Sequence, residues 1–74
     1  MWKTGSMLIH GKVYHYQVKV SNEGSVFGID GGKIFKVWIT LGEDEVMCYD
    51  RGWDVEPQDE DTELALAILL KEHN

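Results

Sequence analysis

Cysteine is almost absent from this sequence, and its scarcity excludes several classes of protein. Cys48 is the single cysteine, so the composition excludes an internal disulfide and a multi-cysteine zinc site. No apolar run approaches the roughly eighteen residues of a membrane span, and the opening residues Met1 to Gly5 do not resemble a signal peptide. We therefore expect a soluble, cytoplasmic protein without a membrane partner.

Basic residues are scarce in the second half of the chain. Residues 1–40 carry five lysines and two acids, a net charge of +3, whereas residues 41–74 carry two basic and eleven acidic side chains, a net charge of −9. Such an acidic half repels phosphates, so we expect no direct nucleic-acid binding. The acids can form a solvated surface, a docking face for a basic partner, or an imitation of nucleic-acid phosphate.

Periodicity of two predicts strands in the first two-thirds of the chain. Residues 14–20 alternate apolar and polar side chains, which predicts a strand with one buried face. Gly11 marks a turn before it, and residues 34–41 predict a central strand with Trp38 covering the second side of the sheet. In that strand we expect one face to hold Phe35, Val37, Ile39 and Leu41, and the other Ile34, Lys36, Trp38 and Thr40.

The C-terminal third changes to a helical pattern. Acids precede an apolar run from Leu64 to Leu70, and Asp59 or Asp61 is placed to cap the first amides. At the helical period, one apolar stripe faces the sheet, and a second, with Leu66 and Leu70, lies opposite. Either the N-terminal segment with Trp2 covers the second stripe, or that stripe is a homodimer surface.

These patterns predict one α+β domain over residues 1–74. We expect an antiparallel meander of four to five strands within residues 6–50 and a connector over residues 50–58. A helix over about residues 59–72 then packs on one face. Apolar residues 26–29 and the glycines at 31 and 32 predict a further hairpin.

The glycine and histidine patterns do not match sites of known chemistry. Residues 24–33 are rich in glycine, but Phe27 stands where a phosphate loop needs its first glycine and Ile34 follows the lysine. His10, His15 and Cys48 have no zinc-ligand spacing. The acids near position 52 do not follow a calcium-loop pattern either. We expect no metal site and no cofactor.

The segment Tyr49-Asp50-Arg51-Gly52-Trp53-Asp54 joins the last predicted strand to the helix. Arg51 can bridge Asp50 and Asp54, Gly52 can permit the chain reversal, and Trp53 can close the end of the core. This interpretation makes the segment a structural clasp. The alternative is a small-ligand site, in which Arg51 binds a carboxylate or phosphate and Trp53 stacks on the ligand.

Residues 24–72 resemble a family of small acidic proteins of bacteria, phages and mobile elements. The resemblance rests on Phe27-Gly28-Ile29, on Gly32-Lys33-Ile34 with Lys36, and on residues 49–54 followed by Glu56-Pro57. The family carries no assigned activity. It implies that residues 51–54 belong to the defining core of the family, and it suggests a phage or mobile-element setting.

No nucleophile and base pair is visible, so we predict a protein that is not an enzyme. The leading hypothesis is a small interaction or regulatory module that binds a protein partner through its acidic face and the second helix stripe. The rival is an acidic phage-type inhibitor that mimics nucleic acid in a basic groove. The residues assigned to these contacts are Glu43, Asp44, Glu45, Leu66 and Leu70.

Overall fold

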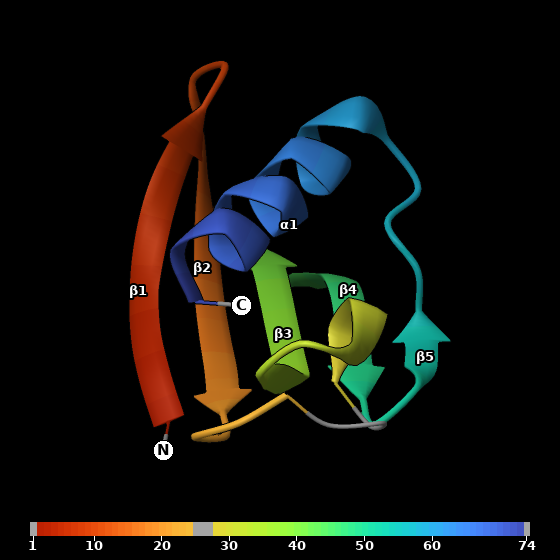
Figure 1. The fold of residues 1–74 in the computed structure, drawn as a ribbon. Helices are drawn as coiled ribbons and strands as arrows, with labels where there is room; N and C mark the ends of the chain where they lie inside the picture. Colours follow the sequence, from red (N-terminus) through yellow and green to blue (C-terminus); the bar gives the residue numbers. More distant parts are fainter. Residues whose placement is uncertain (1, 25–27, 74) are drawn as a thin grey trace.

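Five antiparallel strands and one α-helix make up the part of the protein that the structure describes. The computed structural model describes residues 2–24 and 28–73 of the chain. The strands lie in the sheet in chain order, and the helix crosses one face of the sheet (Figure 1). This confirms the predicted α+β meander. The elements are β1 (Trp2–Ile9), β2 (Lys12–Val20), the short 3₁₀ turn η1 (Ile29–Gly31), β3 (Ile34–Leu41), β4 (Asp44–Asp50), β5 (Trp53–Val55) and α1 (Glu60–His73).

The hairpin of β1 and β2 is the most regular part of the sheet. Its turn consists of His10 (φ 49°) and Gly11 (φ 78°), both in the left-handed region that a tight two-residue hairpin turn requires. From Ile9 opposite Lys12 to Trp2 opposite Lys19, the pairing has no irregularity. β1 therefore begins at Trp2, earlier than position 6, where the sequence pattern predicts the first strand.

Register shifts occur in each of the other strand pairs, and one of them changes a predicted face. Between Lys19 and Val20 the pairing with β3 shifts, so that Val20 lies opposite Ile34. Ile34 is consequently fully buried in the core. The prediction that Ile34 shares a face with Trp38 was wrong, because a bulge reverses the alternation that a regular strand would keep.

The loop after β2 differs from the predicted hairpin. Ile29–Gly31 forms the 3₁₀ turn η1, with hydrogen bonds from the amide of Gly31 to the carbonyl of Gly28 (3.1 Å) and from Gly32 to Ile29 (2.9 Å). Ile29 is buried against the core. Residues 26 and 27 of the predicted apolar segment lie outside the described residues.

The core lies between α1 and one face of the sheet. Alternate residues of β2, β3 and β4 point toward the helix, and they are buried or half-buried. The helix contributes Ala65 and Leu69, which are fully buried. The sheet and the loops contribute Ile9, Tyr14, Val18, Ile29, Ile34, Val37, Ile39, Met47 and Tyr49.

Asp59 caps the start of α1. The backbone amide of Thr62 donates to Asp59 Oδ1 at 2.7 Å, and the amide of Glu63 donates to the Asp59 carbonyl at 3.1 Å. The hydrogen bond from the Thr62 amide holds the pKa of Asp59 below its ordinary value. Of the two predicted capping residues, Asp59 is therefore the one that caps the helix. Asp61 instead contacts the turn between β1 and β2.

The helix does not present the predicted free second stripe. Leu66 and Leu70 are half-buried and pack against the core. The apolar side chains that stay exposed are Leu64, at 44%, and Ala67. Leu66 and Leu70, which the sequence pattern assigns to an interaction surface, therefore present only part of their side chains to solvent. The helix is rotated so that its most apolar arc, wider than one stripe, faces the sheet.

Trp2 does not cover the helix. Its ring contacts Trp38, with 5.4 Å between the ring centroids, on the face of the sheet opposite α1. The alternative in which the N-terminal segment wraps the helix was therefore wrong. None of the helices formed by the described residues has the length and apolar character of a membrane span.

Candidate functional site

The face of the sheet opposite α1 carries a mixed aromatic and polar surface. We call it the open face, because no described element covers it (Figure 1). The strand register arranges its side chains in cross-strand rows. One row consists of Trp2, Lys19, Lys36 and Asp50, the next of Thr4, Gln17, Trp38 and Cys48, and a third of Ser6, His15, Thr40 and Glu45.

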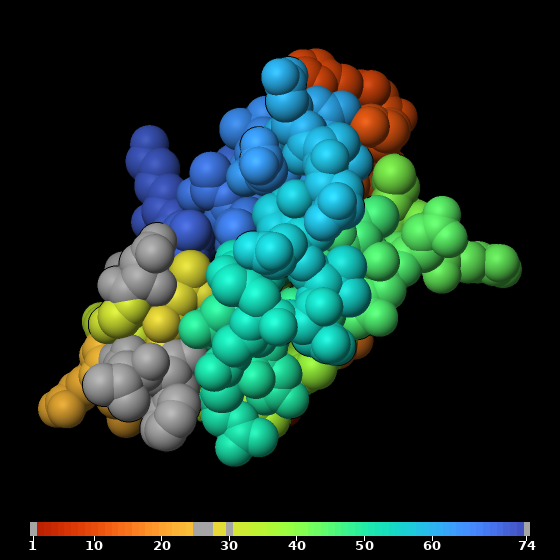
Figure 2. Space-filling view, turned by 90° about the vertical axis from the view of Figure 1, so that its right-hand side faces the viewer, coloured from red at the N-terminus to blue at the C-terminus, as the bar shows by residue number. Residues whose placement is uncertain are grey.

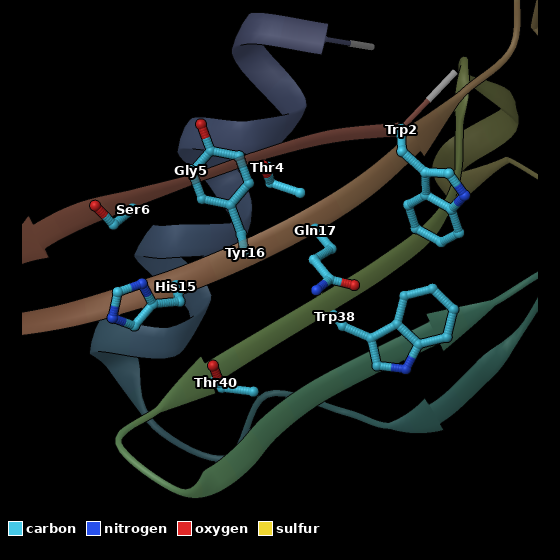
Figure 3. Close-up of a pocket in the computed structure, with 9 residues that line it drawn as sticks. All are labelled: Trp2, Thr4, Gly5, Ser6, His15, Tyr16, Gln17, Trp38 and Thr40. Atoms are coloured by element: carbon cyan, nitrogen blue, oxygen red, sulfur yellow. The ribbon is translucent and has the colours of Figure 1, made fainter.

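A groove of about 820 Å³ lies on this face, over β1, β2 and β3. Trp2 and Trp38 form its aromatic end, with their rings inclined at 39°, and Gln17 lies beside them (Figure 3). The remaining lining residues present hydroxyl, imidazole and backbone groups: Thr4, Gly5, Ser6, His15, Tyr16 and Thr40. Apolar rings beside hydrogen-bonding groups are typical of a surface that binds another molecule.

Lysine side chains border the aromatic end of the groove. The Lys19 ammonium lies 5.5 Å from the centroid of the Trp2 ring and 5.9 Å from that of Phe35. Lys36, directly opposite Lys19, pairs with Asp50 at 3.6 Å. Two lysines opposite each other repel, and the rings and the Asp50 carboxylate offset that repulsion.

Arg51 occupies a different geometry from the one that its sequence context suggests. Its Nε donates to Asp50 Oδ1 at 3.3 Å, and within the described ranges Arg51 and Asp54 form no ion pair. Arg51, with φ 59°, supplies the left-handed residue of the reversal, a role that the sequence analysis gives to Gly52. Its amide donates to the Phe35 carbonyl at 2.9 Å, which ties the turn to β3.

Trp53 lies at the edge of the core and does not close it. The ring is 43% exposed and meets Tyr49 edge-on, with 5.1 Å between the ring centroids. Asp54 is also exposed. Residues 53–55 form β5, a short strand within the predicted connector, so the segment joins the sheet through pairing of Trp53 with Tyr49 and of Val55 with Cys48.

A second contact region lies at the turn between β1 and β2, away from the segment that joins β4 to β5. Here ion pairs join the sheet to the helix. Asp61, in the first turn of α1, accepts from His10 Nδ1 at 2.7 Å and from Lys12 Nζ at 2.8 Å. Both partners belong to the hairpin of β1 and β2. These contacts, first with Lys12 and then with His10, hold the pKa of Asp61 below its ordinary value. No local sequence pattern predicts this contact, because His10 and Asp61 are 51 positions apart.

The Asp61 tie should make the domain sensitive to acid. A carboxyl whose pKa is lowered by folding stabilises the protein above its ordinary pKa, and this contribution is lost as the pH falls through the lower, folded value. Asp61→Asn should lower the urea midpoint of unfolding at neutral pH. As the pH falls, the midpoint of the variant should decrease less steeply than that of the wild type. Urea unfolding from pH 7 to pH 2 measures both effects. The control Asp44→Asn, at the exposed start of β4, should leave the decline of the urea midpoint in acid as steep as in the wild type.

Cys48 is buried in β4 and has little nucleophilic character. It is 4% exposed, and burial, assisted by the nearby carboxylate of Glu45, raises the pKa of the thiol to about 11. Among the described residues, no group of three histidine, cysteine or acidic side chains could hold a metal ion. His10 contacts Asp61, and His15 lines the groove.

Cys48 should therefore resist thiol reagents while the protein is folded. The raised pKa lowers the thiolate fraction at neutral pH, and burial slows access further. We expect a chromogenic disulfide reagent to react at least about a hundredfold more slowly with the native protein than with the protein in urea. Equal rates in both conditions would contradict the placement of Cys48.

Glu43, in the turn between β3 and β4, and Asp44 and Glu45, at the start of β4, are all exposed. The segments that carry most of the acids, within residues 43–63, gather on the side of the molecule shown in Figure 2. The charge asymmetry of the sequence is thus also an asymmetry in space. The acidic side lies along β4, β5 and the start of α1, whereas residues 2–20, which form β1 and β2, contain no acid.

The groove was not among the predicted site residues. Its polar members, His15 and Gln17, occupy the outward positions of β2, which the sequence analysis takes as a solvated face. A signal was present in Trp38, a large aromatic residue on the second side of a central strand. The missing information was the pairing that places Trp2 beside it.

Comparison with known proteins assigns the chain to a family. Residues 1–74 match the model described as Domain of unknown function (DUF7678), so the chain belongs to this family. No curated protein and no solved structure matches it. The description of the family assigns no activity to the site.

Proposed function

We propose that the protein is a non-enzymatic interaction module of the cytoplasm that binds a protein partner on the open face of its sheet. The observation that supports this most is the groove over β1, β2 and β3, where Trp2 and Trp38 stand beside hydrogen-bonding side chains. Tryptophan in such a setting is typical of the energetic centre of an interface. The resemblance of the chain to small phage and mobile-element proteins favours an accessory or regulatory role.

The groove also indicates the chemistry of the partner. An apolar or aromatic side chain of the partner can pack on Trp2 and Trp38, and polar groups can bond to Gln17 and Thr40. Lys19, at the border of the groove, favours a carboxylate on the partner. The partner surface is therefore apolar at its centre and acidic at its border.

A paired binding experiment tests this proposal. His15 and Gln17 are exposed, so His15→Glu with Gln17→Glu should preserve the fold, which circular dichroism verifies. A host protein captured by the wild type should bind the purified domain in a titration. We expect the double variant to weaken that binding at least about tenfold, and the helix control Leu64→Ser to leave it unchanged. Unchanged binding by the double variant would refute the open face as the binding surface.

The acidic side supports a second candidate function. Nine exposed Asp and Glu residues lie within residues 43–63, the segments that gather on the side shown in Figure 2, and they could occupy a basic groove in place of nucleic acid. In that case the triple change of Glu43, Asp44 and Glu45 to their amides should weaken binding. Added salt should weaken it steeply, and His15→Glu with Gln17→Glu should not.

A further inference from the structure

The outer edge of β1 is long, regular and open to pairing. β1 pairs with β2 over its whole length without a register shift, whereas each of the other three strand pairs contains one. Proteins usually protect such an edge with proline, a bulge or charges, and of these β1 has only Lys3. The opposite edge is protected, because β5 is three residues long and Pro57 follows it.

Hairpin geometry identifies the backbone groups on this edge. In a two-residue hairpin the residues that flank the turn, here Ile9 and Lys12, form a hydrogen-bonded pair. Hydrogen-bonded and non-hydrogen-bonded pairs alternate from there along β1. The even-numbered residues therefore point their N–H and C=O groups away from β2, and their side chains lie on the open face. These residues are Trp2, Thr4, Ser6 and Leu8.

We propose that β1 pairs antiparallel with β1 of a second copy around a twofold axis at Gly5, which joins the two sheets into one. This register places Thr4 opposite Ser6 of the second copy and Trp2 opposite Leu8, twice each. These are the residues with outward backbone groups, so they form the hydrogen-bonded pairs across the axis. The inference does not depend on the groove as a partner site.

The exposed apolar side chains of β1 favour this register. Trp2 is 46% exposed and Leu8 is 70% exposed, and they stand at opposite ends of the same face of one strand. Pairing around Gly5 brings Trp2 of each copy against Leu8 of the other. Val13, which is opposite Leu8 on β2 and 47% exposed, extends the apolar contact. The register thus covers three of the exposed large apolar residues.

Gly5 suits the position on the axis. A Cβ on Gly5 would lie 2.8 Å from Cζ of Tyr16, so the Tyr16 ring fills the space above this glycine (Figure 3). On the axis Gly5 faces Gly5 of the second copy in a non-hydrogen-bonded pair, where the backbones are closest. Each Tyr16 ring then covers the glycine of its own copy, which is a known way to stabilise a glycine at a sheet edge.

Charge does not oppose the pairing, although each copy carries a net charge of −6. β1 and β2 contain no acid, and the acidic side of the molecule lies along β4 and β5, at the other end of the sheet. Within the pair, Lys3 faces Met7 of the second copy, so no like charges stand opposite each other.

Sedimentation equilibrium of the full chain, from micromolar to millimolar concentration, tests the proposal. We expect a monomer–dimer equilibrium that Leu8→Lys weakens more than about a hundredfold, because the change occurs twice in each dimer. Thr4→Pro should act similarly, since it removes an outward N–H and leaves the pairing with β2 intact. The controls Thr4→Val, Leu64→Lys and His15→Glu with Gln17→Glu should remain dimeric. A monomeric wild type, or a dimer unaffected by both edge variants, would overturn the proposal.

Disulfide trapping tests the register. Thr4→Cys and Ser6→Cys variants, mixed and mildly oxidised, should form a mixed disulfide dimer, because the two positions face each other across the axis. Neither variant alone should form a comparable amount of dimer. Native Cys48 is buried and should not interfere. Equal trapping in each single variant would refute the register centred on Gly5.

Discussion

Replacing Leu69 by alanine should cost about 3 kcal/mol of unfolding free energy, because it leaves a cavity between α1 and the sheet. Leu69 is fully buried, and only Ala65 and Thr62 accompany it as fully buried residues of the helix. The total unfolding free energy of a domain of this length is roughly 4–11 kcal/mol, at about 0.05–0.15 kcal/mol per residue. The thermal midpoint should fall by roughly 12–24 °C, which calorimetry measures.

The matched control for Leu69 lies in the same helix. Leu64 is 44% exposed, so Leu64→Ala preserves helix propensity and removes little buried surface. We expect it to cost no more than about 0.5 kcal/mol. If both alanine variants lost similar stability, the helix would face the sheet through a different arc, and the assignment of its buried side would be wrong.

Alanine at Gly28 should have an effect of similar size for a different reason. A Cβ at this position would overlap the carbonyl oxygen of Gly32 and lie 2.8 Å from its carbonyl carbon. Backbone atoms cannot move aside as a flexible side chain can, so the turn η1 and buried Ile29 must shift. We expect a loss on the order of 3 kcal/mol, measured by urea unfolding.

Gly31→Ala separates overlap from backbone strain at this turn. Gly31 has φ 72°, but a Cβ there would meet nothing within 4 Å. Its substitution should cost only the roughly 1–2 kcal/mol of a left-handed alanine. If Gly28→Ala were no more costly than Gly31→Ala, the close approach of Gly28 and Gly32 would be refuted.

The sequence predicted those elements whose pattern repeats over many residues. The alternation from Tyr14 to Val20 identified β2 and its buried face, and the change to a helical period identified α1. The start of β1 was missed, because Trp2, Lys3, Thr4 and Gly5 show no clear alternation. β5 was missed as well, since its three residues become a strand only by pairing with β4.

The candidate site was less predictable, because it depends on register. Residues 50–54 are distinctive in the sequence, which predicts that Arg51 bridges Asp50 and Asp54. In the described structure Arg51 pairs with Asp50 and not with Asp54, and Trp53 lies at the surface. The groove requires Trp2 and Trp38 to meet across β2, which depends on the register of β1 with β2 and of β2 with β3. No local pattern encodes such pairings.

The meander topology has a consequence for the order in which the protein assembles. Each strand pairs with its neighbour in the chain, so the sheet can grow by closing short loops, which is fast. The helix is different, because Asp61 must find His10 across 51 positions. We therefore expect α1 to dock late and slowly. Until it docks, the apolar face around Tyr14, Val18 and Val37 is exposed to solvent and prone to aggregation.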